Sequence, residues 1–265
     1  MKMCSKFRFG IARAISLALL LMCILFSLNC LDNLLSRMLI DSIQDKDTER
    51  ALKIINMECS LGFDVNTPDS VNWLSRISED TPDIPLSIAC RTGNATITQA
   101  LLDAGASANG VSGCGWSPLM EVLLAPPCSS DITIVELLMA YGADPGREEN
   151  GSYPILQAAQ RVPCEYLLEP EPESSLHYGK EYDSGIAVEI TKVFDRLAQH
   201  TDCHVVDSIG RNALHYAAMY GNYELVHYLL DQQGFDPLVQ DHFGKTAYDL
   251  ANECGYTELS HILNP

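Results

Sequence analysis

Small and apolar residues recur at the same positions in two segments of the chain, 207–221 and 241–255. Both segments begin with aspartate, have glycine at the fourth position and alanine at the seventh and eleventh, and end with glycine. The second copy begins 34 residues after the first. A fixed period of this length predicts one supersecondary unit that is copied and stacked along the chain.

Five positions in the chain carry the start of this apolar pattern. They are Pro85, Pro118, Pro154, Ala213 and Ala247, at intervals of 33, 36, 59 and 34 residues. Proline fits the first position of a helix, because the N–H there has no intrahelical partner. A second apolar stretch follows within each unit, so the pattern predicts two helices per unit and an insertion in the long interval.

These residues resemble the ankyrin repeat, whose family pattern is Thr-Pro-Leu-His-x-Ala-Ala, then Gly, then a Val/Leu-rich helix and Gly-Ala-Asp. The chain has Ser-Pro-Leu-Met at 117–120, Gly-Ala-Asp at 142–144 and Ala-Leu-His-Tyr-Ala-Ala at 213–218. The resemblance covers roughly residues 45–265 and implies an all-α fold, an ankyrin-repeat α-solenoid of helix-turn-helix units with hairpin loops. We expect about five recognisable repeats, preceded by a degenerate capping repeat.

Domain organisation follows from the period. We expect an N-terminal hydrophobic segment at 1–31 and one ankyrin-repeat domain at 32–265, with insertions near 66–82, 125–130 and 160–190. The largest insertion contains a stretch rich in Pro, Glu and Ser at 169–183, which disfavours helix and strand. It is either an acidic finger that contacts a basic partner or a tolerated surface loop, since loop-closure entropy grows slowly with length.

Residues 14–31 form an apolar stretch without a charge, and basic residues precede it. Its length is at the lower limit for crossing a bilayer and also fits a signal peptide. We expect a single-pass N-terminal membrane anchor; the alternatives are a cleaved signal with secretion, or a cytoplasmic protein in which this helix caps the array. One apolar helical face, as a cap would need, is continued by Leu31, Leu34, Leu35, Met38 and Leu39.

The chain is strongly acidic, with a formal net charge of −18. Nucleic-acid binding needs a basic surface, so the charge argues against it, whereas a basic protein partner fits. The same acidity also simply keeps a protein soluble. The 10 cysteines show no Cys-x-x-Cys spacing, which disfavours a zinc ribbon or a thioredoxin-like site and favours reduced core cysteines.

Catalytic motifs for phosphate binding, zinc proteolysis and serine hydrolysis are absent from the sequence, so we expect no enzyme activity and no cofactor. The metal-ligand-like cluster is His200, Cys203 and His204, which a continuous helix would place on one face. It falls where a helix should end, and histidine is favoured there by the helix dipole. A metal site or enzyme at this cluster is the remote alternative. We interpret His215, at the family's Leu-His position, as structural.

Function is therefore expected at the surface. Stacked repeats form a concave face from first helices and hairpin tips, where partners bind. By the resemblance, the tip residues that contact a partner include Asn109, Trp116, Arg147, Ile209, Arg211, His242 and Phe243. Trp116 and Phe243 are the candidate anchors, because aromatic residues supply much of the binding energy at interfaces; the alternative is packing between hairpins. We expect a monomeric, non-enzymatic scaffold for a protein partner, membrane-tethered or, alternatively, cytosolic.

Overall fold

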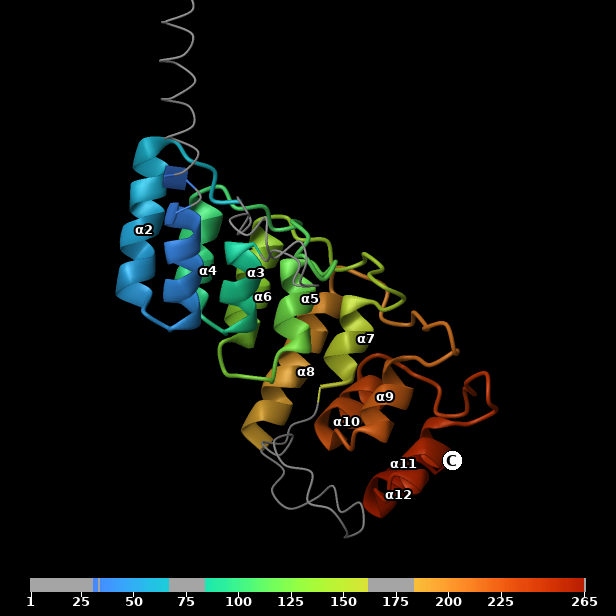
Figure 1. The fold of residues 1–265 in the computed structure, drawn as a ribbon. Coiled ribbons are helices and arrows are strands. Elements are labelled where there is room, and N and C mark those ends of the chain that lie inside the picture. The colour runs from blue at the N-terminus through green and yellow to red at the C-terminus, as the bar shows by residue number, and fades with distance from the viewer. Residues whose placement is uncertain (1–30, 33, 67–83, 162–183, 265) are drawn as a thin grey trace, which may run out of the picture.

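The computed structural model describes residues 31–32, 34–66, 84–161 and 184–264, and this part of the chain consists of helices and connecting loops (Figure 1). The predicted all-α class is confirmed, because the described residues contain no strand beyond one isolated bridge between Glu149 and Ser152. A helix at 34–44 comes first. It is followed by α2 (Thr48–Leu61), α3 (Pro85–Arg91), α4 (Ala95–Asp103), α5 (Pro118–Leu124), α6 (Asp131–Ala140), α7 (Pro154–Ala159), α8 (Ser184–Ala198), α9 (Ala213–Met219), α10 (Tyr223–Asp231), α11 (Ala247–Glu253) and α12 (Thr257–Leu263).

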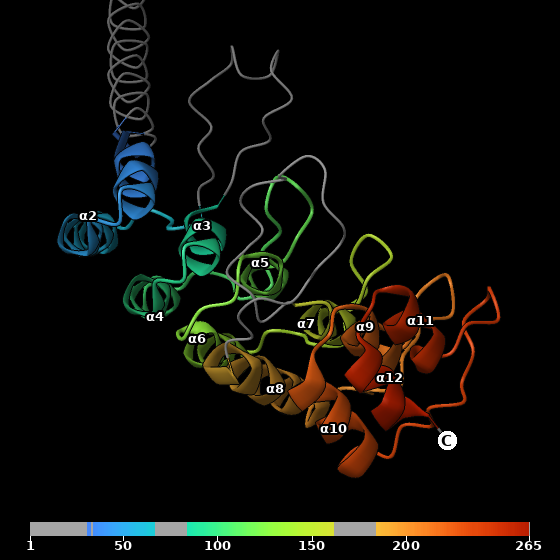
Figure 2. The same ribbon diagram turned by 90° about the horizontal axis from the view of Figure 1, so that it is seen from below.

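The helices lie in two rows that curve together (Figure 2). In the inner row, α3, α5, α7, α9 and α11 each contact the next, and in the outer row α2, α4, α6, α8 and α10 do the same. Each inner helix from α3 to α11 also contacts the outer helix that follows it in sequence. The helix at 34–44 pairs with α2 at the N-terminal end of the array (Figure 1).

All five predicted starts of first helices are confirmed. Pro85, Pro118 and Pro154 are the first residues of α3, α5 and α7, and Ala213 and Ala247 are the first residues of α9 and α11. The two starts that lack proline have capping boxes instead, in which the side chain before the helix bonds the third helical N–H and the third side chain bonds back. Either device satisfies or removes an unpaired donor at the helix start.

The insertion predicted near 160–190 is shorter than expected, because α8 begins at Ser184. Ile190, Val193, Phe194 and Leu197 of α8 are all buried, at the spacing of one helical face. The last residues of the predicted insertion therefore belong to the second helix of the fourth unit.

The other insertions are placed differently. Residues near 125–130 connect α5 to α6. The acidic stretch 169–183 lies outside the described residues, and so does nearly all of the insertion predicted near 66–82.

The predicted N-terminal hydrophobic helix and single-pass membrane anchor at 14–31 require correction. Across the described ranges, no helix combines the length and the apolar character that crossing a bilayer requires. Residues 14–30 themselves lie outside the described residues. The apolar face proposed for a cap is buried only from Leu35 onward: Leu35 and Leu39 are 4% and 0% exposed, whereas Leu31 is 39% exposed.

Glu58 on α2 is a buried carboxylate without hydrogen-bond partners for either oxygen. Burial, assisted by the negative charges of Asp32 and Asp64, raises the pKa of Glu58 from 4.5 to about 7. The folded state therefore holds its proton in a pH range where the unfolded chain releases it, so this residue makes stability fall as the pH rises from about 4.5 through about 7.

Glu58→Gln is expected to raise the free energy of unfolding at pH 8 by about 1 to 3 kcal/mol. The upper value corresponds to the whole pKa shift, and screening of the carboxylate by solvent reduces it toward the lower value. At pH 4.5 the change should be small, because the carboxyl group is then protonated in the folded state and about half protonated in the unfolded chain. Urea unfolding at the two pH values measures the difference. A gain of the same size at both, or a loss at pH 8, would contradict this account of Glu58.

Candidate protein-binding surface

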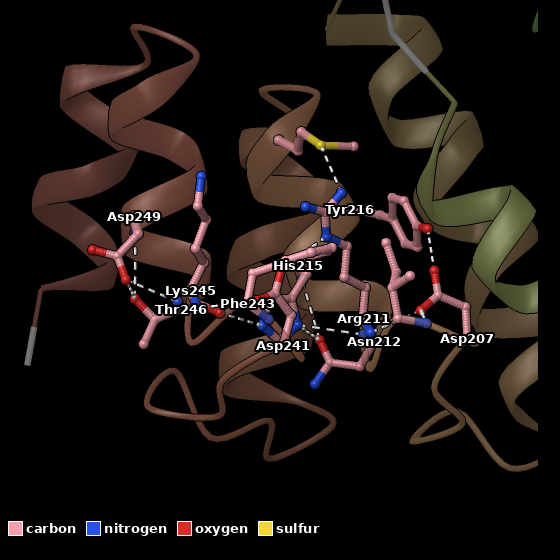
Figure 3. Close-up of polar contacts among 12 residues, drawn as sticks. Asp207, Arg211, Asn212, His215, Tyr216, Asp241, Phe243, Lys245, Thr246 and Asp249 are labelled. Atoms are coloured by element: carbon pink, nitrogen blue, oxygen red, sulfur yellow. Dashed lines mark hydrogen bonds and ion pairs between the residues drawn. The ribbon is translucent and has the colours of Figure 1, made fainter.

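The tips of the last two hairpins, 207–211 and 241–245, have the same backbone structure (Figure 3). In each tip the Oδ1 atom of the first residue, Asp207 or Asp241, accepts bonds of 2.9 to 3.0 Å from the N–H groups two and four residues later. The N–H of each aspartate in turn donates to the carbonyl four residues later, at 3.0 and 2.9 Å. Each aspartate therefore closes a rigid loop from its own side chain.

The two tips are also bonded to each other. The N–H of His242 donates to the carbonyl of Ile209 at 2.9 Å. The Nε atom of Arg211 donates to Oδ2 of Asp241 at 3.0 Å, and the Asp241 side chain is fully buried (Figure 3). These bonds fix the position of one tip relative to the next.

Asp241 is ionised despite its burial. Burial alone would raise the pKa of Asp241, but the N–H groups of Lys245 and Phe243 and the guanidinium of Arg211 together hold it below its ordinary value. The ionised carboxylate satisfies three donors at once, so the charge serves to order the tip.

His215 joins α9 to the following tip. Its Nε2 atom lies 3.3 Å from the carbonyl oxygen of Lys245, so this nitrogen carries the proton and donates. Its Nδ1 atom can then accept from the N–H of Asn212 at 3.3 Å. Burial lowers the pKa of His215, which keeps the ring neutral, as this arrangement needs. His215 is structural, as the sequence indicated.

Gly210 and Gly244 occupy equivalent tip positions, with φ angles of 79° and 75°. A Cβ atom at Gly210 would lie 2.6 Å from Cδ2 of His242, whereas a Cβ at Gly244 would meet no atom within 4 Å. The two glycines therefore carry the same backbone requirement but different steric surroundings.

Gly210→Ala is expected to destabilise the protein by about 2 kcal/mol, and Gly244→Ala by about 1 kcal/mol. Both variants force alanine into a left-handed conformation, but only the first displaces the His242 ring. Urea unfolding of both measures the difference, and His242→Ala in the Gly210→Ala background should remove it. Equal losses for the two glycine variants would show that the His242 contact has no effect on stability.

Phe243 is the most exposed of the predicted anchors, with 67% of its surface accessible. Its backbone is fixed by Asp241, so its ring projects from a rigid support. Leu238 and Val239, in the hairpin that leads to this tip, are also exposed. Neither residue is among the tip residues predicted from the sequence, although two adjacent aliphatic residues in a loop are a usable signal.

The other predicted tip residues have different surroundings. Trp116 is half-buried and packs against the core, in agreement with the packing alternative. Arg147 is partly exposed, with Nε 4.0 Å from Oε1 of Glu149. The structure therefore brings Ile209, Arg211, His242 and Phe243 together on adjacent tips, while Asn109, Trp116 and Arg147 lie in earlier units.

Asn109 links its own hairpin to the next unit. Its Nδ2 donates to the carbonyl of Gly142 at 2.7 Å, and its Oδ1 accepts from the N–H of Asp144 at 2.9 Å. Asn66 makes the corresponding pair of bonds to Gly105 and Ser107. The asparagine at this hairpin position thus bonds one unit to the next. From the resemblance, Asn109 was expected to contact a partner instead.

The residues of the metal alternative do not converge. Cys203 is buried, with Sγ 3.5 Å from Oε1 of Gln233, and His204 stacks on Phe235 with ring centroids 4.4 Å apart. His200 is exposed just beyond the end of α8. Among the residues that the structure describes, no three His, Cys, Asp or Glu side chains are grouped so that they could hold a metal ion. The six cysteines in the described ranges are all free thiols.

Comparison with known proteins supports the family assignment. The family model "Ankyrin repeats (3 copies)" matches residues 185–264, which hold α8 to α12. This chain contains ankyrin repeats. The same two-helix unit extends through the described structure toward the N-terminus, and the ankyrin array is all-α, as the resemblance implied.

Two curated relatives are similar to this chain over about two thirds of its length or more. "Putative palmitoyltransferase ZDHHC13" of Danio rerio is 27% identical over 229 residues, covering 77% of this chain and 31% of the relative. "Mitochondrial disaggregase" of Homo sapiens is 27% identical over 190 residues, covering 66% of this chain and 25% of the relative. The chain thus spans less than a third of the length of either relative, and the similarity concerns that part alone.

Proposed function

We propose that this ankyrin array is a non-enzymatic adaptor that binds a partner protein at the tips of its last two units. The supporting observation is Phe243, a large aromatic side chain that is 67% exposed on a backbone fixed by hydrogen bonds. An exposed aromatic ring on a rigid support supplies contact area at small entropic cost, which is a property of binding hot spots.

The neighbouring residues suit such a site. His242 and Leu238 are exposed beside Phe243 in the same hairpin, so apolar and polar contacts are available together. Arg211 and Asp241, which are largely buried and paired, would support the surface without contacting the partner. The net charge of −18 favours a partner with basic residues around the apolar contact.

We also propose that the helix at 34–44 serves as the N-terminal cap of the array. Its buried face contains Leu39, Ile40 and Ile43, whereas Asp41 and Gln44 are exposed. A terminal repeat with one polar face is what a stacked array needs at its end.

Affinity capture tests the proposed binding site. The full chain and its Phe243→Ala variant are used as baits. Ile262→Ala is the control, because Ile262 is also an exposed hydrophobic residue but lies on α12. We expect proteins captured by the wild type and by the control to be lost with Phe243→Ala. The same set of partners for all three baits would exclude the tips as the binding site.

A further inference from the structure

An open groove of about 440 Å³ lies between α8 and α10, in the outer row of helices. Val188, Lys192 and Asp195 line it from α8, and Glu224, Tyr228 and Asp231 line it from α10. The proposed binding tips belong to the hairpins before α9 and α11, so this groove is a separate feature of the surface. Its volume is within the range of sites that bind small groups or single side chains.

The lining of the groove combines an aliphatic and an aromatic side chain, Val188 and Tyr228. Val188 is 42% exposed although it belongs to a helix with a buried face. The Tyr228 ring packs edge-on against Phe194, with centroids 6.2 Å apart and an interplanar angle of 75°. The Tyr228 hydroxyl donates to Asp195 and accepts from Nε2 of Gln233, so the ring is held in place.

Three carboxylates are among the groups that line the groove, those of Asp195, Glu224 and Asp231. The hydrogen bonds that the Asp195 carboxylate accepts come from neutral donors, the Tyr228 hydroxyl and the Gln199 amide, so they leave its negative charge in place. Lys192 also lines the groove, but its ammonium group forms an ion pair of 2.7 Å with Glu189 of the same helix. Its positive charge is therefore balanced by Glu189.

We infer that this groove is a second docking site, which takes an arginine side chain from a short basic segment of a protein. A guanidinium is planar, stacks on an aromatic ring and bonds a carboxylate with two parallel N–H groups. The three methylenes of arginine would lie on Val188, and the guanidinium would lie at Tyr228 and Asp231. The charge of the groove selects a cation, and the tyrosine ring favours arginine over lysine.

The test uses a fluorescein-labelled tetra-arginine peptide, with tetra-lysine and the uncharged tetra-citrulline as comparison peptides. Fluorescence anisotropy gives the Kd for the full chain and for two double variants. Glu224→Gln with Asp231→Asn removes two charges from the groove. Glu136→Gln with Glu258→Gln removes two exposed charges from α6 and α12, the second helices of other units, and is the matched control.

We expect tetra-arginine to bind most tightly and tetra-citrulline not to bind. The groove variant should weaken arginine binding by about three- to tenfold, as two exposed charges imply, while the control stays within about twofold of wild type. Amide shifts in NMR spectra with tetra-arginine should centre on residues 188–195 and 224–232. Equal weakening by both variants, equal affinity for lysine, no binding, or shifts centred elsewhere would overturn the inference. None of these results depends on Phe243.

Discussion

Phe243→Ala is expected to weaken binding of the captured partner by about 30-fold or more, which corresponds to roughly 2 kcal/mol of binding free energy. The side chain is 67% exposed, so most of its surface is available for burial in a complex. Its backbone is already ordered by Asp241, so little entropy is lost when the ring becomes fixed. Isothermal titration calorimetry with the purified partner measures the change.

The loss should be confined to binding. Because the ring makes few contacts within the array, the melting temperature of Phe243→Ala should equal that of the wild type. Ile262→Ala, which shortens a partly exposed side chain on α12, should leave the affinity unchanged. Wild-type affinity for Phe243→Ala would show that Phe243 is no anchor, and a lowered melting temperature would show that the ring contributes to packing.

Arg161→Ala is expected to lower the free energy of unfolding by about 3–5 kcal/mol. Nη2 of Arg161 lies 2.7 Å from Oδ2 of Asp131, and both side chains are almost completely buried. The same nitrogen donates to the carbonyl of Ala125 at 3.1 Å. Removing the guanidinium would leave the Asp131 carboxylate buried without its counterion, between the end of α5 and the start of α6.

Urea unfolding of three proteins tests this explanation. Arg161→Met combined with Asp131→Asn removes both charges and keeps most of the buried volume. In the wild type the Asp131 carboxylate accepts a hydrogen bond from the N–H of Cys128, and the Asn side chain retains an oxygen for this bond. We therefore expect the double variant to be more stable than Arg161→Ala by at least about 1 kcal/mol. If the double variant is as unstable as the single one, the unpaired charge of Asp131 is not the cause of the loss.

The helix starts could be predicted because their signals are local. Pro85, Pro118 and Pro154 mark the first position of their helices directly. In the last two units, the pattern repeated after 34 residues predicts that the helices begin at Ala213 and Ala247. Stacking contacts depend on the same repeated positions, so period alone was sufficient for the architecture of this part of the chain.

The surroundings of single residues could not be predicted in this way. Arg161 follows the end of α7 and looked like the start of an insertion, yet its partner is 30 positions earlier in sequence. Trp116 and Phe243 were equivalent candidates, but Trp116 packs on the core and Phe243 does not. Burial of this kind depends on which neighbouring residues cover a tip, and a repeat pattern does not contain that information.

The doubled segment itself separates stacking from recognition. Asp207 and Asp241 agree between the copies, and both order their tips through the same two backbone bonds. Ile209 and Phe243 occupy one equivalent position and differ: Ile209 is half-buried, whereas Phe243 is exposed. The aspartate that both copies share therefore serves the fold. The position at which the copies differ, Ile209 and Phe243, is where binding specificity can be set.

Hydrogen–deuterium exchange of the full chain, with and without its captured partner, tests the central claim most directly. The proposed binding site predicts protection of the hairpin residues at 207–211 and 236–245 in the complex, since partner contact would exclude solvent from both tips. The same experiment on Phe243→Ala at matched concentrations should show less protection there. Protection confined to α4 and α6 in the outer row, with no change at the two tips, would contradict the account.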